Sequence, residues 1–283
     1  MNIREPLFAL QGWYPSREGD CREAIAGYLK SYPGSPAGNL AGIVPHAGWV
    51  YSGRLAALTF AALDAVKPQL VFLFGGHMHP GQKCECMTEG AFGTPLGPVV
   101  VHQELANELT AKFDCSTQTP HNASPDNTIE LQMPFIRSVW PEAKVVAVAV
   151  APGEQAGQIG RFCSQQASAL NLKAVAIGST DLTHYGMNYG FSPKGSGPEA
   201  LEWSKQQNDR PFIDRLLALD GPGATEHALA NHSACCPGAA AAALAFAKDR
   251  GAKAGKLIEH TTSHEVEGRG SPNMWVGYAS IVY

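Results

Sequence analysis

Short apolar runs alternate with helical segments along most of this chain, and the alternation constrains its fold more than any other feature. Buried strands are predicted at Leu40–Val44, Leu70–Phe74, Lys144–Val150 and Lys173–Ile177. Helical segments of about 10–15 residues separate the strands, and strands joined in this way pair in parallel beneath their crossover helices. The pattern therefore predicts an α/β fold of one domain over residues 1–283, with a mainly parallel central sheet flanked by helices.

Capping and breaking residues give the expected helix ends. Asp20 and Glu23 form a capping box for a helix through Lys30, and the chain then turns at Pro36. Ser52 can cap the next helix. Further helices are expected over His102–Phe113, Asp126–Val139, Gly157–Leu170, Ala200–Leu219 and Gly238–Arg250, and further strands over Lys256–Thr261 and Met274–Val282.

The composition limits the classes of partner. Hydrophobic residues make up 45% of the chain and charged residues 16%, which disfavours disorder, because an average globular protein is roughly 25% charged. The formal net charge is −4, and no basic stripe is present for a nucleic-acid backbone. No stretch approaches the ~20 apolar residues that span a bilayer. We expect neither nucleic acid nor a membrane as a partner.

The cysteines and the first residues indicate a compartment. The apolar run near the first residue is too short for the core of a secretory signal. The chain has 7 cysteines, an odd number, and disulfides are rare in the reducing cytoplasm. We therefore expect a cytoplasmic protein whose thiols are free, buried or bound to metal.

Histidines follow three of the predicted strands. His46 lies just past the first, His77 and His79 follow the second, and Asp181 leaves a later strand together with His184. The ends of parallel strands meet at one edge of a sheet, where α/β proteins bind their ligands. A carboxylate three residues from an imidazole can orient it. The pattern predicts a metal site, although any one of these histidines alone would more often only bond its own loop.

Two adjacent thiols, Cys235 and Cys236, precede Pro237, which suits the first position of a helix. A helix N-terminus favours the thiolate, the form that binds metals. Because consecutive residues that enter a helix through Pro237 are not expected to face the same pocket, we predict that only one thiol binds. The other is interpreted as a small buried hydrophobic residue.

One other group of residues predicts a rival metal site, and two further motif interpretations are excluded. His77, His79, Cys84 and Cys86 are enough ligands for a local structural zinc, although their spacings differ from the usual C-x₂₋₄-C pairs. The run GAKAGKL lacks a spacer residue and the hydroxyl of a phosphate-binding loop. No G-x-S-x-G or G-x-G-x-x-G sequence occurs, which removes the simplest hydrolase and dinucleotide-binding interpretations.

An ordered set of motifs resembles one family nearly end to end. The set comprises ALQGWYPSREGDCREAIAGYL, PHAGWVYSG, FGGHMHP, EGAFGTPLGPVVV, DNTIELQMPFI, GSTDLTHYG and the cysteine turn before the Ala-rich helix. The chain resembles the Memo-like proteins, also called the AmmeMemoRadiSam system protein B family. These are similar in fold to class III extradiol ring-cleavage dioxygenases, and the resemblance implies the same α/β domain.

The resemblance also implies roles for particular residues. It puts metal ligands at His46, His77 and Cys235, and a catalytic acid/base at His184 with Asp181 beside it. His79 is an alternative to His77, because the short motif can be shifted by two residues, and Cys236 stands where the family usually has glycine. In the family's E-H-S-L-E element, a pocket histidine is replaced by Asn127.

Two functions of different class follow from the resemblance. The first is a non-haem metal-dependent oxidoreductase, dioxygenase-like, that acts on a small phenolic molecule, with iron(II) as the first choice of metal and zinc or copper next. The second is a non-catalytic protein that binds a metal, a ligand or a peptide in a vestigial pocket. A thiol in place of the usual carboxylate argues against standard ring cleavage. The family name also implies a radical-enzyme system as a partner.

Overall fold

A mixed sheet forms the centre of the protein in the computed structural model, which describes residues 1–34 and 38–283. The turn expected at Pro36 lies outside the described residues. The strands of the sheet follow the order β10 (His184–Tyr185), β12 (Trp275–Val282), β2 (Ala41–Val44), β9 (Ala174–Ser179), β3 (Leu70–Gly75), β8 (Lys144–Ala149), β4 (Glu85–Met87) and β7 (Ser116–Gln118), and β11 (Lys256–Thr262) pairs with β12.

The middle of this sheet is parallel, as the sequence predicts. β2 pairs with β9, β9 with β3, and β3 with β8, all in parallel, and every residue of β2, β3 and β9 is buried. Strands buried on both faces are uniformly apolar because helices cover both sides. Antiparallel β12 and β4 flank this centre, so the complete sheet is mixed. A small separate sheet joins β1 (Ile3–Arg4), β5 (Ala91–Phe92) and β6 (Val99–Val100).

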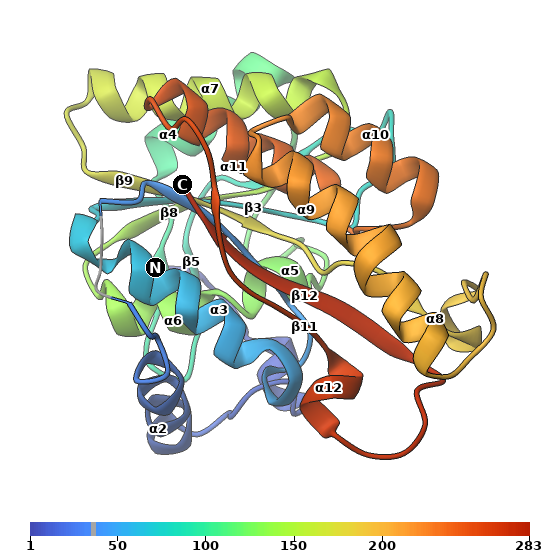
Figure 1. Ribbon diagram of the computed structural model, residues 1–283. Helices are drawn as coiled ribbons and strands as arrows, with labels where there is room; N and C mark the ends of the chain where they lie inside the picture. Colours follow the sequence, from blue (N-terminus) through green and yellow to red (C-terminus); the bar gives the residue numbers. More distant parts are fainter. Residues whose placement is uncertain (35–37) are drawn as a thin grey trace.

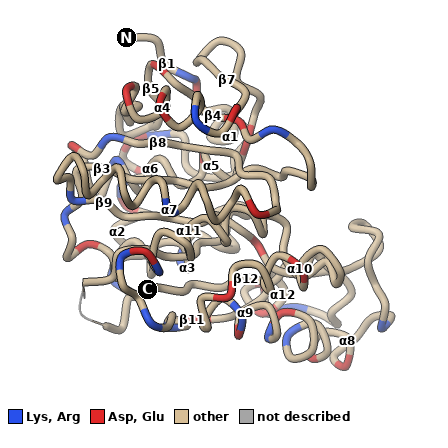
Figure 2. Tube along the Cα trace, turned by 90° about the horizontal axis from the view of Figure 1, so that it is seen from above, with Lys and Arg blue, Asp and Glu red and all other residues tan. Residues whose placement is uncertain are grey.

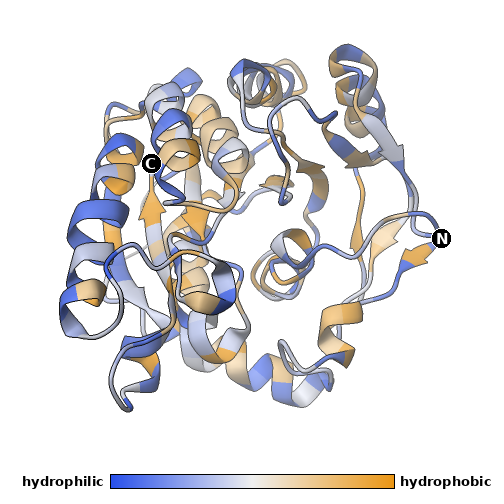
Figure 3. Ribbon diagram, turned by 90° about the vertical axis from the view of Figure 1, so that its right-hand side faces the viewer, coloured by the Kyte–Doolittle hydropathy of each residue, from blue (hydrophilic) through white to orange (hydrophobic). Residues whose placement is uncertain are grey.

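Helices cover the two faces of the central sheet (Figure 1). On one face lie α2 (Glu18–Leu29), α3 (Trp49–Leu63) and α6 (Met133–Val139), and on the other lie α7 (Glu154–Ala169) and α11 (Pro237–Asp249). Strongly apolar strands lie between these layers in Figure 3. The arrangement is a single α/β domain, as predicted.

Small residues bring α11 unusually close to the sheet. A Cβ at Gly178 of β9 would lie 2.8 Å from the carbonyl oxygen of Ala239 in α11. A Cβ at Gly160 of α7 would collide with the carbonyl oxygen of Ala242. Because α11 has alanine along its buried face, these backbones can approach closely, and the first turn of α11 is fixed at the carboxyl edge of the sheet.

Several predicted helix ends differ from the structure. Instead of starting at Asp20, α2 begins at Glu18, and no side chain caps it. Ser52 lies inside α3, where its hydroxyl donates to the Ala47 carbonyl rather than capping the helix. The helix expected over Asp126–Val139 is divided into α5 (Asn127–Glu130) and α6, because Pro134 has no N–H to continue the hydrogen-bond ladder.

Three of the described α-helices were not predicted, and the longest of them is α10 (Gly221–Asn231). The sequence of α10 begins Gly-Pro-Gly, which resembles a turn, but Asp220 caps it through the Gly223 N–H at 3.0 Å. The helical stretch expected over Ala200–Leu219 contains a π-helical segment, Ser204–Asp209. The other helices are α1 (Leu7–Leu10), α4 (Gln103–Phe113), α8 (Pro198–Trp203), α9 (Arg210–Leu217) and α12 (Ser263–Glu267).

Charged residues of both signs are interspersed along the chain rather than gathered on one side (Figure 2). Across the described ranges, none of the helices combines the length and apolar character required to cross a membrane.

Candidate metal centre

Three strand ends and one helix start bring the candidate residues together. His46 follows β2, His77 follows β3, and Asp181 follows β9. Cys235 lies in the turn just before α11. Because β2, β9 and β3 are neighbours and run in parallel, their carboxyl ends share one edge of the sheet, and α11 starts at that same edge.

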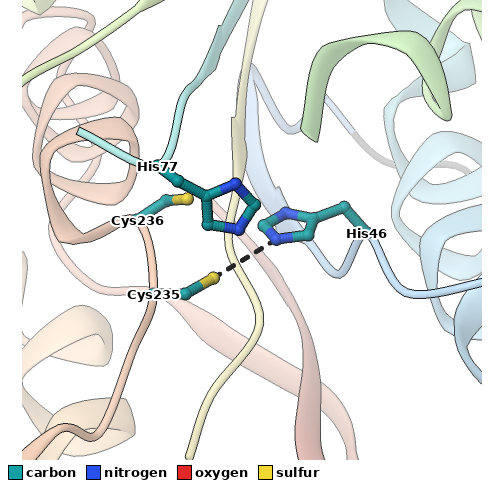
Figure 4. Close-up of side chains that lie close together, drawn as sticks. All are labelled: His46, His77, Cys235 and Cys236. Atoms are coloured by element: carbon teal, nitrogen blue, oxygen red, sulfur yellow. Dashed lines mark hydrogen bonds between the residues drawn. The ribbon is translucent and has the colours of Figure 1, made fainter. Parts of the chain in front are cut away.

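Four side chains form a compact group of donor atoms there (Figure 4). The ligand atoms of His46, His77, Cys235 and Cys236 all lie within 4.8 Å of one another. Within the group, His46 Nε2 lies 3.2 Å from Cys235 Sγ. Imidazoles and thiols of this kind are donors for transition metals, so the residues present fit a metal ion.

Hydrogen bonds hold the His46 ring and backbone in place. Its Nδ1 lies 3.1 Å from the Ser179 hydroxyl, which leaves Nε2 to face the group. Its backbone N–H donates to Asp181 Oδ1 at 2.7 Å, and the Asn127 side chain donates to its carbonyl at 3.1 Å. Such outer contacts orient a ligand histidine and select its tautomer.

The charges of the group are coupled. Burial alone would raise the pKa of the Cys235 thiol, but the Cys236 thiol and the cationic His46 outweigh burial and hold this pKa well below its usual value. At His46, burial is outweighed by Asp181 and Cys235, which raise the pKa to about 9. Without a metal, this coupling favours a thiolate at Cys235 and an imidazolium at His46.

A cavity of about 470 Å³ opens beside the group. His77, Cys235 and His184 lie in its wall, together with the aromatic side chains of Tyr189 and Phe191. The ring of His184 packs edge to face against Tyr189, with 5.0 Å between the ring centroids. Two of the four donor residues, His77 and Cys235, thus line the cavity.

Comparison with known proteins identifies the family. The model of the family described as Memo-like protein matches residues 4–282. The chain belongs to the Memo-like family. A MEMO1 family protein of Pyrococcus horikoshii is 31% identical over 291 residues, covering 99% of this chain and 98% of its own. A MEMO1 family protein of Nitrosopumilus maritimus is 30% identical over 292 residues, covering 99% of both chains.

A solved structure is also similar. The crystal structure of an uncharacterized Escherichia coli protein has a TM-score of 0.47 and 13% identity, covering 87% of this Memo-like chain and 100% of that chain.

Of the two neighbouring histidines, the structure brings His77 into the donor group. His79 is exposed and lines the cavity instead. The rival local zinc site is wrong, because the donor group found within the described residues excludes Cys84 and Cys86, which are buried at the start of β4. Both thiols are engaged elsewhere in this Memo-like domain: Cys84 Sγ accepts from the Ala151 N–H at 3.4 Å and donates to Gln155 Oε1 at 3.5 Å, and Cys86 packs in the core.

Asp181 and His184 lie together, but their contact differs from the prediction. Asp181 Oδ2 is 3.9 Å from His184 Nε2, which is too long for a hydrogen bond. The other carboxylate oxygen is engaged by the His46 N–H. Asp181 therefore acts on His184 through charge and holds the His46 backbone directly.

Of the two adjacent thiols, Cys235 lines the cavity and Cys236 does not, but the two lie closer to the same site than the sequence suggests. The sulfurs of Cys235 and Cys236 both lie within the group of donor atoms. Cys236 is the N-cap residue of α11, with φ −130° and ψ 60°, so the backbone has not yet become helical there. This turn keeps both thiols on the same side of the helix start.

The element that carries Asn127 in this Memo-like chain has two structural functions. Asn127 supports the His46 backbone, as described above. Glu130 accepts hydrogen bonds from the Leu7 and Phe8 N–H groups at 3.1 and 2.7 Å, and from the Tyr14 hydroxyl at 3.1 Å. The short α5 therefore joins the N-terminal segment to the site.

Sequence reasoning missed the hydroxyl groups behind the site. Ser179 contacts His46, and Thr180 accepts the Cys236 N–H at 3.1 Å. His232, which lines the cavity, was also missed. Ser179 ends β9 and Thr180 follows it directly, so their position at a strand end was the available signal, but hydroxyl residues are too common there to stand out.

Proposed function

We propose that this Memo-like protein is a non-haem metal-dependent oxidoreductase, dioxygenase-like, that acts on a small phenolic molecule. One observation carries the proposal: His46, His77 and Cys235 converge beside a cavity whose wall also contains His184. Binding groups for a metal, a proton-transfer group and space for a ligand therefore adjoin one another.

Iron(II) is the first choice of metal because of the resemblance to the dioxygenases, and zinc or copper, which imidazole and thiolate donors also suit, come next. His46, His77 and Cys235 would hold the ion. When bound, iron would supply redox chemistry and open coordination positions. Ser179 and Asp181 would keep the His46 ring and backbone in position, so that Nε2 is available without rearrangement.

His184 is the group proposed to move a proton. Its Nε2 is buried and has no hydrogen-bond partner among residues 1–34 and 38–283. Burial would lower the pKa of His184, but the Cys235 thiolate and the Asp181 carboxylate outweigh burial and raise it. An imidazolium close to the cavity can donate a proton to a bound ligand, and the resulting neutral ring can accept one.

The cavity wall supports the proposed ligand class. Tyr189 and Phe191 provide aromatic surface, Leu182 provides apolar surface, and His184 lies near them. Aromatic rings stack on such surfaces, while a phenolic hydroxyl needs a polar partner. A small phenol meets both requirements in a cavity of about 470 Å³.

The test begins with protein purified without oxygen or chelator. Elemental analysis and iron(II) loading are expected to give one metal per chain, and oxygen uptake is then measured with a panel of phenols and catechols. His184→Ala is expected to keep the metal and lose oxygen uptake. His79→Ala, a matched control from the exposed loop, is expected to keep the metal.

Failure to bind metal after reconstitution would overturn the proposal. If His184→Ala loses metal as completely as His46→Ala does, then His184 is a ligand rather than the proton-transfer group.

The alternative function is non-catalytic binding of a metal, small ligand or peptide in the same pocket. The thiol of Cys235, where ring-cleaving dioxygenases carry a carboxylate, favours it, because a softer donor changes metal preference and redox potential. Metal binding without oxygen uptake on any phenol would select this alternative. With either function, the protein is proposed to work in the cytoplasm, where thiols stay reduced. A radical-enzyme partner remains a prediction.

A further inference from the structure

Cys236 belongs to the donor group, although the family resemblance assigns the ligand thiol to Cys235 alone. Its sulfur lies within 4.8 Å of the ligand atoms of His46, His77 and Cys235, and its side chain is buried. Figure 4 shows Cys236 on the His77 side of the group, whereas Cys235 points toward His46.

The backbone fixes both cysteines against the end of β9. The Cys235 N–H donates to the Asp181 carbonyl at 3.2 Å, and the Cys236 N–H donates to the Thr180 hydroxyl at 3.1 Å. Two residues later, a Cβ at Gly238 would collide with the Val150 carbonyl oxygen. Close packing of the helix start and two anchored amides hold the Cys236 sulfur beside the group.

The spacing of the donors suits one ion. In a tetrahedral site with bonds of about 2.0–2.1 Å to nitrogen and 2.3 Å to sulfur, neighbouring donors lie roughly 3.3–3.8 Å apart. His46 Nε2 and Cys235 Sγ are already 3.2 Å apart, and no pair in the group exceeds 4.8 Å. Closing the group requires movements of about 1 Å, which the exposed His77 loop can accommodate.

We propose that Cys236 is the fourth protein ligand of this metal centre, so that two imidazoles and two thiolates hold the ion. The inference rests on the metal site of the proposed function but not on its oxidoreductase activity. Binding needs both thiolates and a neutral His46 ring, so the protons of the Cys236 thiol and the His46 imidazolium pass to solvent. Two thiolates form a softer donor set than one, so Cys236 favours zinc and copper(I) over iron(II).

Zinc X-ray absorption spectroscopy on the full chain counts the sulfur ligands directly. The wild type is expected to show two sulfurs at about 2.3 Å, and Cys236→Ala only one. Zinc affinity, measured against a competing chelator, is expected to fall by more than roughly 100-fold in Cys236→Ala, since losing a ligand costs more than losing an outer contact. The matched control is Cys163→Ala, which removes another fully buried thiol, in α7 and outside the donor group.

One sulfur in wild-type protein, with less than a tenfold affinity change in Cys236→Ala, would overturn the assignment of Cys236 and leave the metal site of the proposed function intact. A wild type that binds no zinc, iron(II) or copper would instead remove that metal site and this inference together. The wild-type sulfur count decides the question even if Cys236→Ala fails to fold.

Discussion

The donor group has two halves that the protein holds in different ways. His46 and Cys236 are buried and anchored through the segment Ser179–Asp181 at the end of β9. His77 belongs to an exposed stretch between β3 and β4. One half is built into the carboxyl edge of the sheet, and the other approaches it from a surface loop.

Because of this difference, we expect one half to control the affinity for the metal and the other half to control the access of the ion to the site. A ligand that is already oriented loses little conformational freedom when an ion binds, whereas a surface loop must be ordered at that moment. The buried half should therefore determine how tightly a metal is held. The exposed half, which adjoins the cavity through His77, should determine how the ion enters and leaves.

The largest expected effect is a contrast between two alanine substitutions. His46→Ala is expected to abolish stoichiometric zinc binding, because it removes the ligand that Ser179 and Asp181 orient. His77→Ala is expected to weaken affinity by about 100-fold and to speed zinc dissociation, since the buried ligands remain. Calorimetry and chelator competition measure both effects.

His79→Ala is the control for loop disturbance and should bind zinc like the wild type. Equal losses in His46→Ala and His77→Ala would contradict the division into two halves.

The second expected effect is a dependence of zinc affinity on pH. Because the pKa of His46 is raised to about 9, a metal must displace its proton at lower pH. Affinity is therefore expected to rise at least tenfold per pH unit from about pH 7 to 9, and more steeply if Cys236 also loses a proton. Titrations at several pH values measure the slope, and Asp181→Asn should shift the plateau to lower pH.

The stability of the metal-free protein should respond differently. The raised pKa of His46 contributes stability that is lost as pH rises from about 6.5 through 9. The lowered pKa of Cys235 has the opposite effect over this window, because the unfolded thiol keeps its proton while the folded one has lost it. The two contributions oppose each other, so this pair should change the melting temperature with pH less than either group alone would, while zinc affinity rises.

The sequence predicted the parts of the fold that depend on long periodic patterns. The strands β2, β3, β8 and β9 and their parallel pairing follow from apolar runs between helices. The start of α10 was hidden because glycine and proline favour turns, and only Asp220 and tertiary packing stabilise a helix there. Pro134 is itself a sequence signal for the break before α6, although the apolar pattern continues across it.

The site was predictable where it uses uncommon residue types, and unpredictable where it depends on backbone angles and loop packing. Their position at strand ends identified His46 and His77 as candidate ligands, and the family pattern added Cys235. The orientation of Cys236 depends on one residue's backbone angles before α11, which no spacing rule provides. The Asp181 carboxylate could be placed near His184, but its bond to the His46 N–H depends on how two loops pack.

The smallest expected effect concerns Asn127, which supports the buried half without touching the donor atoms. Its side-chain amide donates to the His46 carbonyl at 3.1 Å. In Asn127→Ala this support is lost, but the bonds from Ser179 and Asp181 remain, so zinc affinity is expected to fall by about tenfold. Asn127→Asp should be worse than alanine, because a carboxylate cannot donate to a carbonyl and places a negative charge against it.

Asn122→Ala, which alters an exposed turn, is the matched control and should leave affinity unchanged. Chelator competition can resolve a tenfold change, and the sulfur count at zinc should stay at two in both variants because neither touches a ligand. A loss in Asn127→Ala as large as that in His77→Ala would mean that the buried half is held mainly through α5 rather than through the end of β9. The ranking of these two variants therefore decides which element positions His46.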